Sequence, residues 1–104
     1  MSEFLLTPEA DQDLNDIWDY IAHDDIDAAD RWDTKLREAF AMLAANPHAG
    51  HRRRDLASSS ALFWPVGAYL ILYRILGSRV EILAVTQGSR EIPFFLKSRL
   101  GDDG

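Results

Sequence analysis

A chain of 104 residues that is 47% apolar and 11% aromatic has the size and composition of one small globular domain. Its formal charge of −6 argues against general nucleic-acid binding, because phosphate neutralisation requires a basic surface. It has no cysteine, which excludes disulfides and thiolate zinc sites and leads us to expect a reducing, cytoplasmic location. We therefore expect residues 1–104 to form a single domain with neither metal nor cofactor, and 101–104 to be a flexible tail.

The N-terminus and the apolar runs argue against export and membrane insertion. No basic region precedes the first apolar run, so a secretory signal is not expected. The longest apolar runs, 61–66 and 69–73, are too short to cross a bilayer. We expect no membrane partner.

A short strand at 4–6 is predicted to lead into an amphipathic helix. Thr7 can cap this helix, and Pro8 suits its first position. Apolar residues then recur at helical spacing, at positions 10, 14, 17, 18 and 21. The outer face of the helix is acidic.

A second amphipathic helix follows. Asp25 or Asp27 can cap it, and it ends near Asn46 because Pro47 disfavours helical geometry at the preceding residue. Its apolar stripe comprises positions 29, 32, 36, 40 and 43. The two helices make an αα-hairpin that needs a third surface to cover it.

Three strands rich in β-branched and aromatic residues supply that surface, at 62–66, 69–75 and 79–86. Glycine-containing pairs separate them, so an antiparallel meander is expected. Pro65 cannot donate to a ladder, which places the first strand at an edge. The middle strand is apolar on both faces, so its second face needs a cover, either the C-terminal segment or a partner. The predicted fold is α+β, in the order β-α-α-β-β-β, with the helical hairpin on one face of an antiparallel sheet.

Charged and aromatic residues supply candidate contact sites. Residues 1–46 carry 12 acids and 3 bases, whereas 47–104 carry 5 acids and 8 bases. Three consecutive arginines at 52–54 either balance the acidic helices or contact an acidic partner. The three histidines, His23, His48 and His51, are expected at the surface outside the sheet. No metal-ligand spacing or phosphate-cradling loop is present.

Five segments together resemble the ParE branch of the RelE/ParE toxins of bacterial toxin–antitoxin modules. They are LTPEA at 6–10, DIWDYI at 16–21, AANP at 44–47, PVGAYLILYR at 65–74 and GSREIP at 88–93. The resemblance covers about residues 4–96. It implies a plasmid-stabilisation type of toxin that inhibits DNA gyrase by protein–protein binding and is held in a hetero-oligomer by a ParD-like antitoxin.

The ribonuclease branch of the same superfamily is the main alternative, and it implies catalytic groups that this chain lacks. Arg90 matches a sheet-terminal arginine of that branch, but Leu96 stands where its tyrosine would be and Leu70 where its phosphate-binding arginine would be. Cleavage by a 2′-hydroxyl needs a base, phosphate-binding cations and an acid. We expect no catalytic residue and no enzyme. A degenerate toxin that only binds antitoxin is a third reading, because Gln87 replaces a histidine found in many ParE-like chains.

Two sets of contact residues are predicted. Cationic and aromatic residues are favoured at interface hot spots. The predicted target-binding residues are Arg90, Phe94, Phe95 and Leu96. The predicted antitoxin-binding residues are Arg52, Arg53, Arg54, Trp64, Leu70, Leu72 and Arg74.

Overall fold

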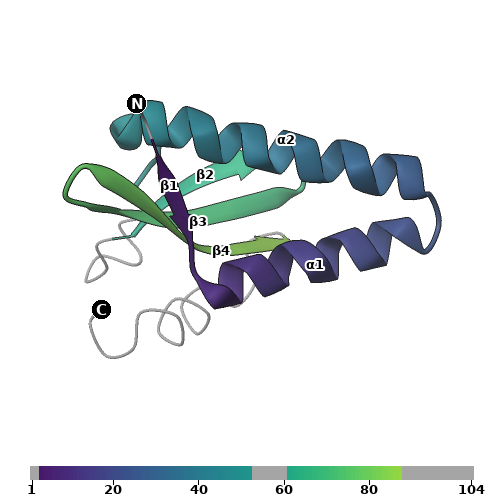
Figure 1. Ribbon diagram of the computed structural model, residues 1–104. Helices are drawn as coiled ribbons and strands as arrows, with labels where there is room; N and C mark the ends of the chain where they lie inside the picture. Colours follow the sequence, from purple (N-terminus) through teal and green to yellow (C-terminus); the bar gives the residue numbers. More distant parts are fainter. Residues whose placement is uncertain (1–2, 53–60, 88–104) are drawn as a thin grey trace.

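The computed structural model describes residues 3–52 and 61–87 (Figure 1). Within them the chain forms two helices and four strands, with a single 3-10 turn between the second helix and the second strand. The elements are β1 (Phe4–Leu6), α1 (Pro8–Ala22), α2 (Ile26–Ala45), η1 (Pro47–Ala49), β2 (Leu62–Val66), β3 (Tyr69–Leu76) and β4 (Arg79–Gln87). The predicted order of elements is confirmed.

The sheet is mixed, with the strand order β1-β4-β3-β2. Strands β2, β3 and β4 form the predicted antiparallel meander. Strand β1 pairs with β4 in parallel, with Phe4 opposite Val80. A parallel pair needs a crossover connection, which α1, α2 and the first two strands of the meander provide here. The predicted antiparallel pairing is confirmed for β2, β3 and β4. The parallel pairing of β1 with β4 makes the whole sheet mixed.

Both helices begin at the caps that the sequence offers. The Thr7 hydroxyl accepts a hydrogen bond from the Ala10 amide at 3.0 Å, and Asp25 does the same for Ala28 at 3.1 Å. Each cap satisfies one amide that has no partner inside its helix. Helix α2 stops before Pro47, as its sequence predicts.

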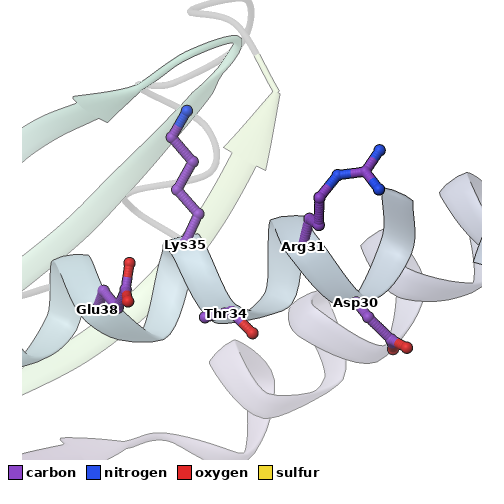
Figure 2. Close-up of a pocket in the computed structure, with 5 residues that line it drawn as sticks. All are labelled: Asp30, Arg31, Thr34, Lys35 and Glu38. Atoms are coloured by element: carbon purple, nitrogen blue, oxygen red, sulfur yellow. The ribbon is translucent and has the colours of Figure 1, made fainter. Parts of the chain in front are cut away.

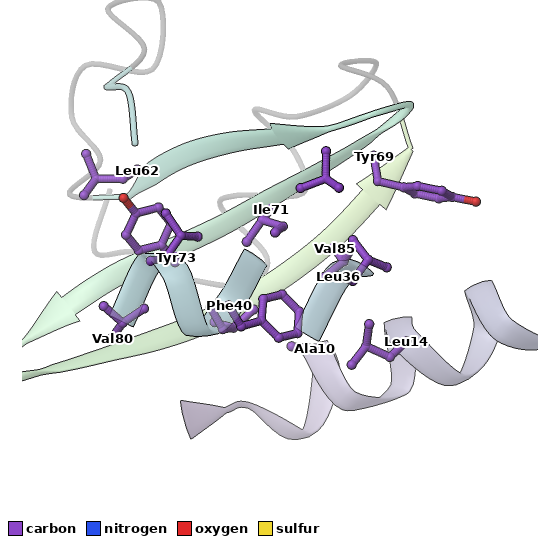
Figure 3. Packing of buried hydrophobic residues seen from close by; sticks show 13 residues of the cluster. Ala10, Leu14, Leu36, Phe40, Leu62, Tyr69, Ile71, Tyr73, Val80 and Val85 are labelled. Atoms are coloured by element: carbon purple, nitrogen blue, oxygen red, sulfur yellow. The ribbon is translucent and has the colours of Figure 1, made fainter. Parts of the chain in front are cut away.

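The main core lies between the helical hairpin and one face of the sheet (Figure 3). Phe40 from α2 is completely buried and its ring lies 5.4 Å from that of Phe4. A hydrogen bond of 3.0 Å from the Val85 amide to the Asp13 carboxylate ties α1 to β4. The cluster comprises Ala10, Leu14, Leu36, Phe40, Leu43, Leu62, Val66, Tyr69, Ile71, Tyr73, Val80, Ile82 and Val85.

A second, smaller cluster lies on the other face of the sheet. It comprises Ala61, Phe63, Leu72, Leu83 and Ala84, with Leu70 packed against it. Leu72 is 0% exposed in the isolated chain. The sequence left two possible covers for this face, the C-terminal segment or a partner. The burial of Leu72 shows that the centre of the face does not require a partner to cover it.

Candidate partner-binding site

The edge of the sheet at β2 carries an unexpected neighbour, His51. Its backbone exchanges two hydrogen bonds of 2.8 Å with Phe63, and its ring stacks on that of Trp64 with 6.2 Å between centroids. The sequence predicted His51 at the surface, in a loop outside the sheet. His51 is exposed and lies outside the named strands, but a single bridge attaches its backbone to the edge strand. One bridge leaves no periodic pattern in a sequence. Pro65, which has no amide hydrogen, occupies the same strand, so this edge offers few groups for the addition of a further strand.

The segment that leads to Arg52 is fixed by a buried tyrosine. The Tyr73 hydroxyl donates to the Pro47 carbonyl at 2.7 Å and accepts from the Gly50 amide at 2.8 Å. A Cβ atom on Gly50 would lie 2.7 Å from Cε1 of Tyr73, so glycine is required for this close approach. Burial raises the pKa of the Tyr73 phenol, and the hydrogen bond from Gly50 opposes that rise. Arg52 itself is exposed.

The arginines in the strands are already engaged in ion pairs. Nε of Arg74 lies 2.7 Å from a carboxylate oxygen of Glu81, and both side chains are partly buried. Arg79 lies 3.6 Å from Glu3 in an exposed pair. The neighbouring carboxylates therefore partly neutralise the positive charges of Arg74 and Arg79.

The predicted antitoxin-binding residues do not form one surface. Trp64 is half-buried and packs against the main core, on the helix side of the sheet. Leu70 packs on the opposite cluster, to which the fully buried Leu72 belongs. Leu72 thus offers no exposed surface to a partner. Arg53, Arg54 and the predicted target-binding residues Arg90, Phe94, Phe95 and Leu96 lie outside the described residues.

Sequence reasoning missed an aromatic surface at the end of the sheet near the β2–β3 turn. Trp32 meets the edge of the Tyr69 ring at 5.2 Å, and Nζ of Lys35 lies 5.0 Å from the centroid of the Trp32 ring. Gly67, with a φ of 59°, makes the turn, and a Cβ there would lie 2.6 Å from the Trp32 ring. Tyr20 is 74% exposed. The available signal was that Tyr20 stands one position off the apolar stripe of α1.

A shallow depression lies on the solvent side of α2 (Figure 2). Two acids, two bases and a threonine line it, namely Asp30, Arg31, Thr34, Lys35 and Glu38. All five residues are exposed. A catalytic pocket buries its reacting groups, so this depression is better described as surface relief between helix side chains.

The described part of the chain contains neither a metal-binding cluster nor a helix that could cross a membrane. Residues 3–52 and 61–87 contain no group of three histidine, aspartate or glutamate side chains placed to hold a metal ion. No helix in the same ranges has the length and apolar character needed to span a bilayer.

Two helices on one face of a mixed four-stranded sheet define a small α+β protein of the kind that the sequence predicted. The chain belongs to the ParE toxin family, because residues 4–92 match the family described as the ParE toxin of a type II toxin–antitoxin system, parDE. A structure entitled a chromosomal ParDE TA system from P. aeruginosa is similar in fold, with a TM-score of 0.71 and 20% identity. That similarity covers 86% of this chain and 98% of the other. No curated protein matches the chain.

Proposed function

We propose that this chain is a toxin that inhibits DNA gyrase by binding to it, and that a cognate, ParD-like antitoxin encoded beside it neutralises that activity. Membership of the ParE toxin family over residues 4–92 is the observation that carries the proposal. In this proposal the toxin inhibits gyrase by protein–protein binding. It therefore requires a binding surface and no catalytic group.

The electrostatics of the sheet support binding over ribonuclease chemistry. A phosphate in the transition state of RNA cleavage needs free cations beside it. Among the strands of the described residues, the arginines are Arg74 and Arg79, and each has a carboxylate partner. Leu70, the position that matches a phosphate-binding arginine, is half-buried against an apolar cluster. Both features weaken the case for an endonuclease.

The contact surfaces remain proposals. Arg52, which the Tyr73 hydrogen bonds hold near the sheet edge, and the half-buried ring of Trp64 are available to an antitoxin on one side of the molecule. Arg90, Phe94, Phe95 and Leu96 are proposed to contact gyrase. A cation beside aromatic residues has the composition favoured at interface hot spots.

The test combines growth with two purified assays. Induction of the chain alone should stop growth and induce the DNA-damage response, whereas co-expression of the adjacent antitoxin gene should restore growth. The purified chain should inhibit supercoiling by gyrase, and Arg90→Ala should reduce that inhibition while the variant keeps its helical content. Arg79→Ala is the matched control, because it removes one exposed arginine from the hairpin end of the sheet.

Two results would overturn this function. Cuts in messenger RNA on ribosomes, with gyrase unaffected, would identify the endonuclease instead. Tight antitoxin binding without growth arrest or effect on gyrase would identify a degenerate toxin, in line with Gln87 at the end of β4.

A further inference from the structure

The face of the sheet opposite the helices is buried at its centre. Its buried part, which we term the outer cluster, comprises Ala61, Phe63, Leu72, Leu83 and Ala84. The exposed fractions of these side chains lie between 0% and 3%. Leu5 and Leu76 point to the same face, because side chains alternate along a strand, and they are 41% and 44% exposed. A leucine on this face is therefore accessible away from the centre, and the outer cluster is covered.

The helices do not supply this cover. Helices α1 and α2 pack their buried side chains into the main core, on the other face of the sheet. Among the described residues, no member of either helix belongs to the outer cluster. Side chains on one sheet stand roughly perpendicular to it, so neighbours on the same face do not close over a leucine from above. The cover therefore comes from outside the described elements.

Composition favours the C-terminal segment as that cover. Two longer segments lie outside the described residues, 53–60 and 88–104. The first contains one large aliphatic side chain, Leu56, and it returns to the edge strand β2. The second contains five large apolar side chains, namely Ile92, Phe94, Phe95, Leu96 and Leu100.

The C-terminal segment also starts at a suitable place. Strand β4 is an inner strand of the sheet, and its last residue, Gln87, stands opposite Tyr69. Leu72 stands opposite Ala84, three residues back along β4, which is about 10 Å at the rise of a strand. Four residues, 88–91, are enough for a turn that reverses the chain. Five further residues, 92–96, span up to about 16 Å and can cross the outer cluster.

We propose that residues 92–96, with the sequence IPFFL, dock on the outer cluster and cover it in the free toxin. Two aromatic rings on an apolar sheet face remove a large apolar area from water. Arg90 then lies between the end of β4 and a docked segment, which positions it for the proposed contact with gyrase. Gyrase meets the side chains of this segment that the sheet leaves uncovered. The inference rests on the proposed function only for the role given to Arg90.

The test measures nuclear Overhauser contacts in the free, full-length chain with labelled leucine methyl groups. The rings of Phe94 and Phe95 should show contacts to the methyl groups of Leu72 and Leu83. Phe94→Leu and Phe95→Leu, which keep the side chains apolar, assign each contact to one ring. Leu14 is the matched control, because it is buried in the main core on the helix side and should show no contact to either ring.

Urea denaturation provides a second measurement. Replacement of both phenylalanines, Phe94→Ser with Phe95→Ser, should lower the midpoint of unfolding by about 1 M or more, because the outer cluster loses its cover. Leu76→Thr changes an exposed residue on the same face and keeps a strand-forming side chain. It should leave the midpoint within about 0.3 M of wild type. If the double variant does not fold, the contacts in the wild-type chain decide alone.

Three results would contradict the docking. Contacts from Leu56, in place of the two rings, would assign the cover to residues 53–60. Contacts seen only between differently labelled copies would assign it to a second copy of the chain. Absence of ring contacts to Leu72 and Leu83, with an unchanged midpoint for the double variant, would show that the segment stands away from the sheet. Each of these results leaves gyrase inhibition to be decided by its own assay, and ring contacts in a chain that does not inhibit gyrase would overturn the proposed function alone.

Discussion

The two ends of the helical hairpin share one sequence pattern and differ in burial. Over the sheet, Leu14, Phe40 and Leu43 are between 0% and 2% exposed. Towards the other end, Ile17 and Ile21 on the same stripe of α1 are only half-buried, and Tyr20 and Ile26, which lie off the stripes, are 74% and 60% exposed. Apolar spacing shows which side of a helix faces the core, but the length of the strands determines how much of that side the sheet covers. The first end holds the fold together, and the second leaves more apolar surface exposed.

The largest expected effect is that of Phe40→Ala at the covered end. Phe40 is completely buried against Phe4, and the truncation leaves a cavity that the surrounding side chains cannot fill. The free energy of unfolding should fall by about 3–5 kcal/mol, measured by urea denaturation. A loss below about 1 kcal/mol would show that the covered end is not the stabilising one.

Tyr73→Phe should have the next largest effect, because it removes a buried hydroxyl that bonds the Pro47 carbonyl and the Gly50 amide. Loss of these bonds should lower the free energy of unfolding by about 1–3 kcal/mol. Hydrogen exchange at the Gly50 amide should accelerate in the variant. An unchanged exchange rate would contradict the role of the hydroxyl in holding the segment before Arg52.

The same tyrosine predicts a dependence on pH. Burial raises the pKa of the folded Tyr73 phenol above its ordinary value of 10.0. Below pH 10 the phenol is neutral in both states, and above it the unfolded chain releases its proton first. Stability is therefore lost as the pH rises through the folded pKa. Denaturation curves above pH 10 should show a steeper loss for wild type than for Tyr73→Phe, in which Tyr69 still titrates.

A smaller effect is expected where the two helices meet outside the sheet. Nε1 of Trp18 donates to the Asp30 carboxylate at 2.9 Å in an exposed position. A double-mutant cycle with Trp18→Phe and Asp30→Ala should give a coupling energy of about 0.5–1 kcal/mol. A coupling of zero would show that this exposed hydrogen bond does not stabilise the helical hairpin.

Much of the fold follows from local signals in the sequence. Thr7 and Asp25 cap their helices, Pro47 ends the second one, and the glycine turns define the meander. The parallel pairing of β1 with β4 could not be predicted, because three apolar residues at 4–6 match any strand in any direction. In the folded chain Phe4 packs on Phe40 of α2, a tertiary contact that residues 4–6 alone do not specify.

The candidate site was less predictable for a physical reason. Alternation along 69–75 shows which residues share a face, but it carries no information on whether the chain covers that face itself. Leu72 is therefore buried where a partner contact was predicted. Tyr20 was assigned no role, because an exposed residue on an acidic helix face has no distinctive sequence pattern. The Trp32 and Tyr69 rings are distant in sequence, and only the tertiary structure brings these two rings together.

The smallest effect is expected for Ile26→Ser. Ile26 is the first residue of α2 and is 60% exposed, so little apolar surface returns to water when it is replaced. The free energy of unfolding should change by less than about 0.5 kcal/mol in urea denaturation. A loss above about 1 kcal/mol would instead show that Ile26 packs against the rest of the fold.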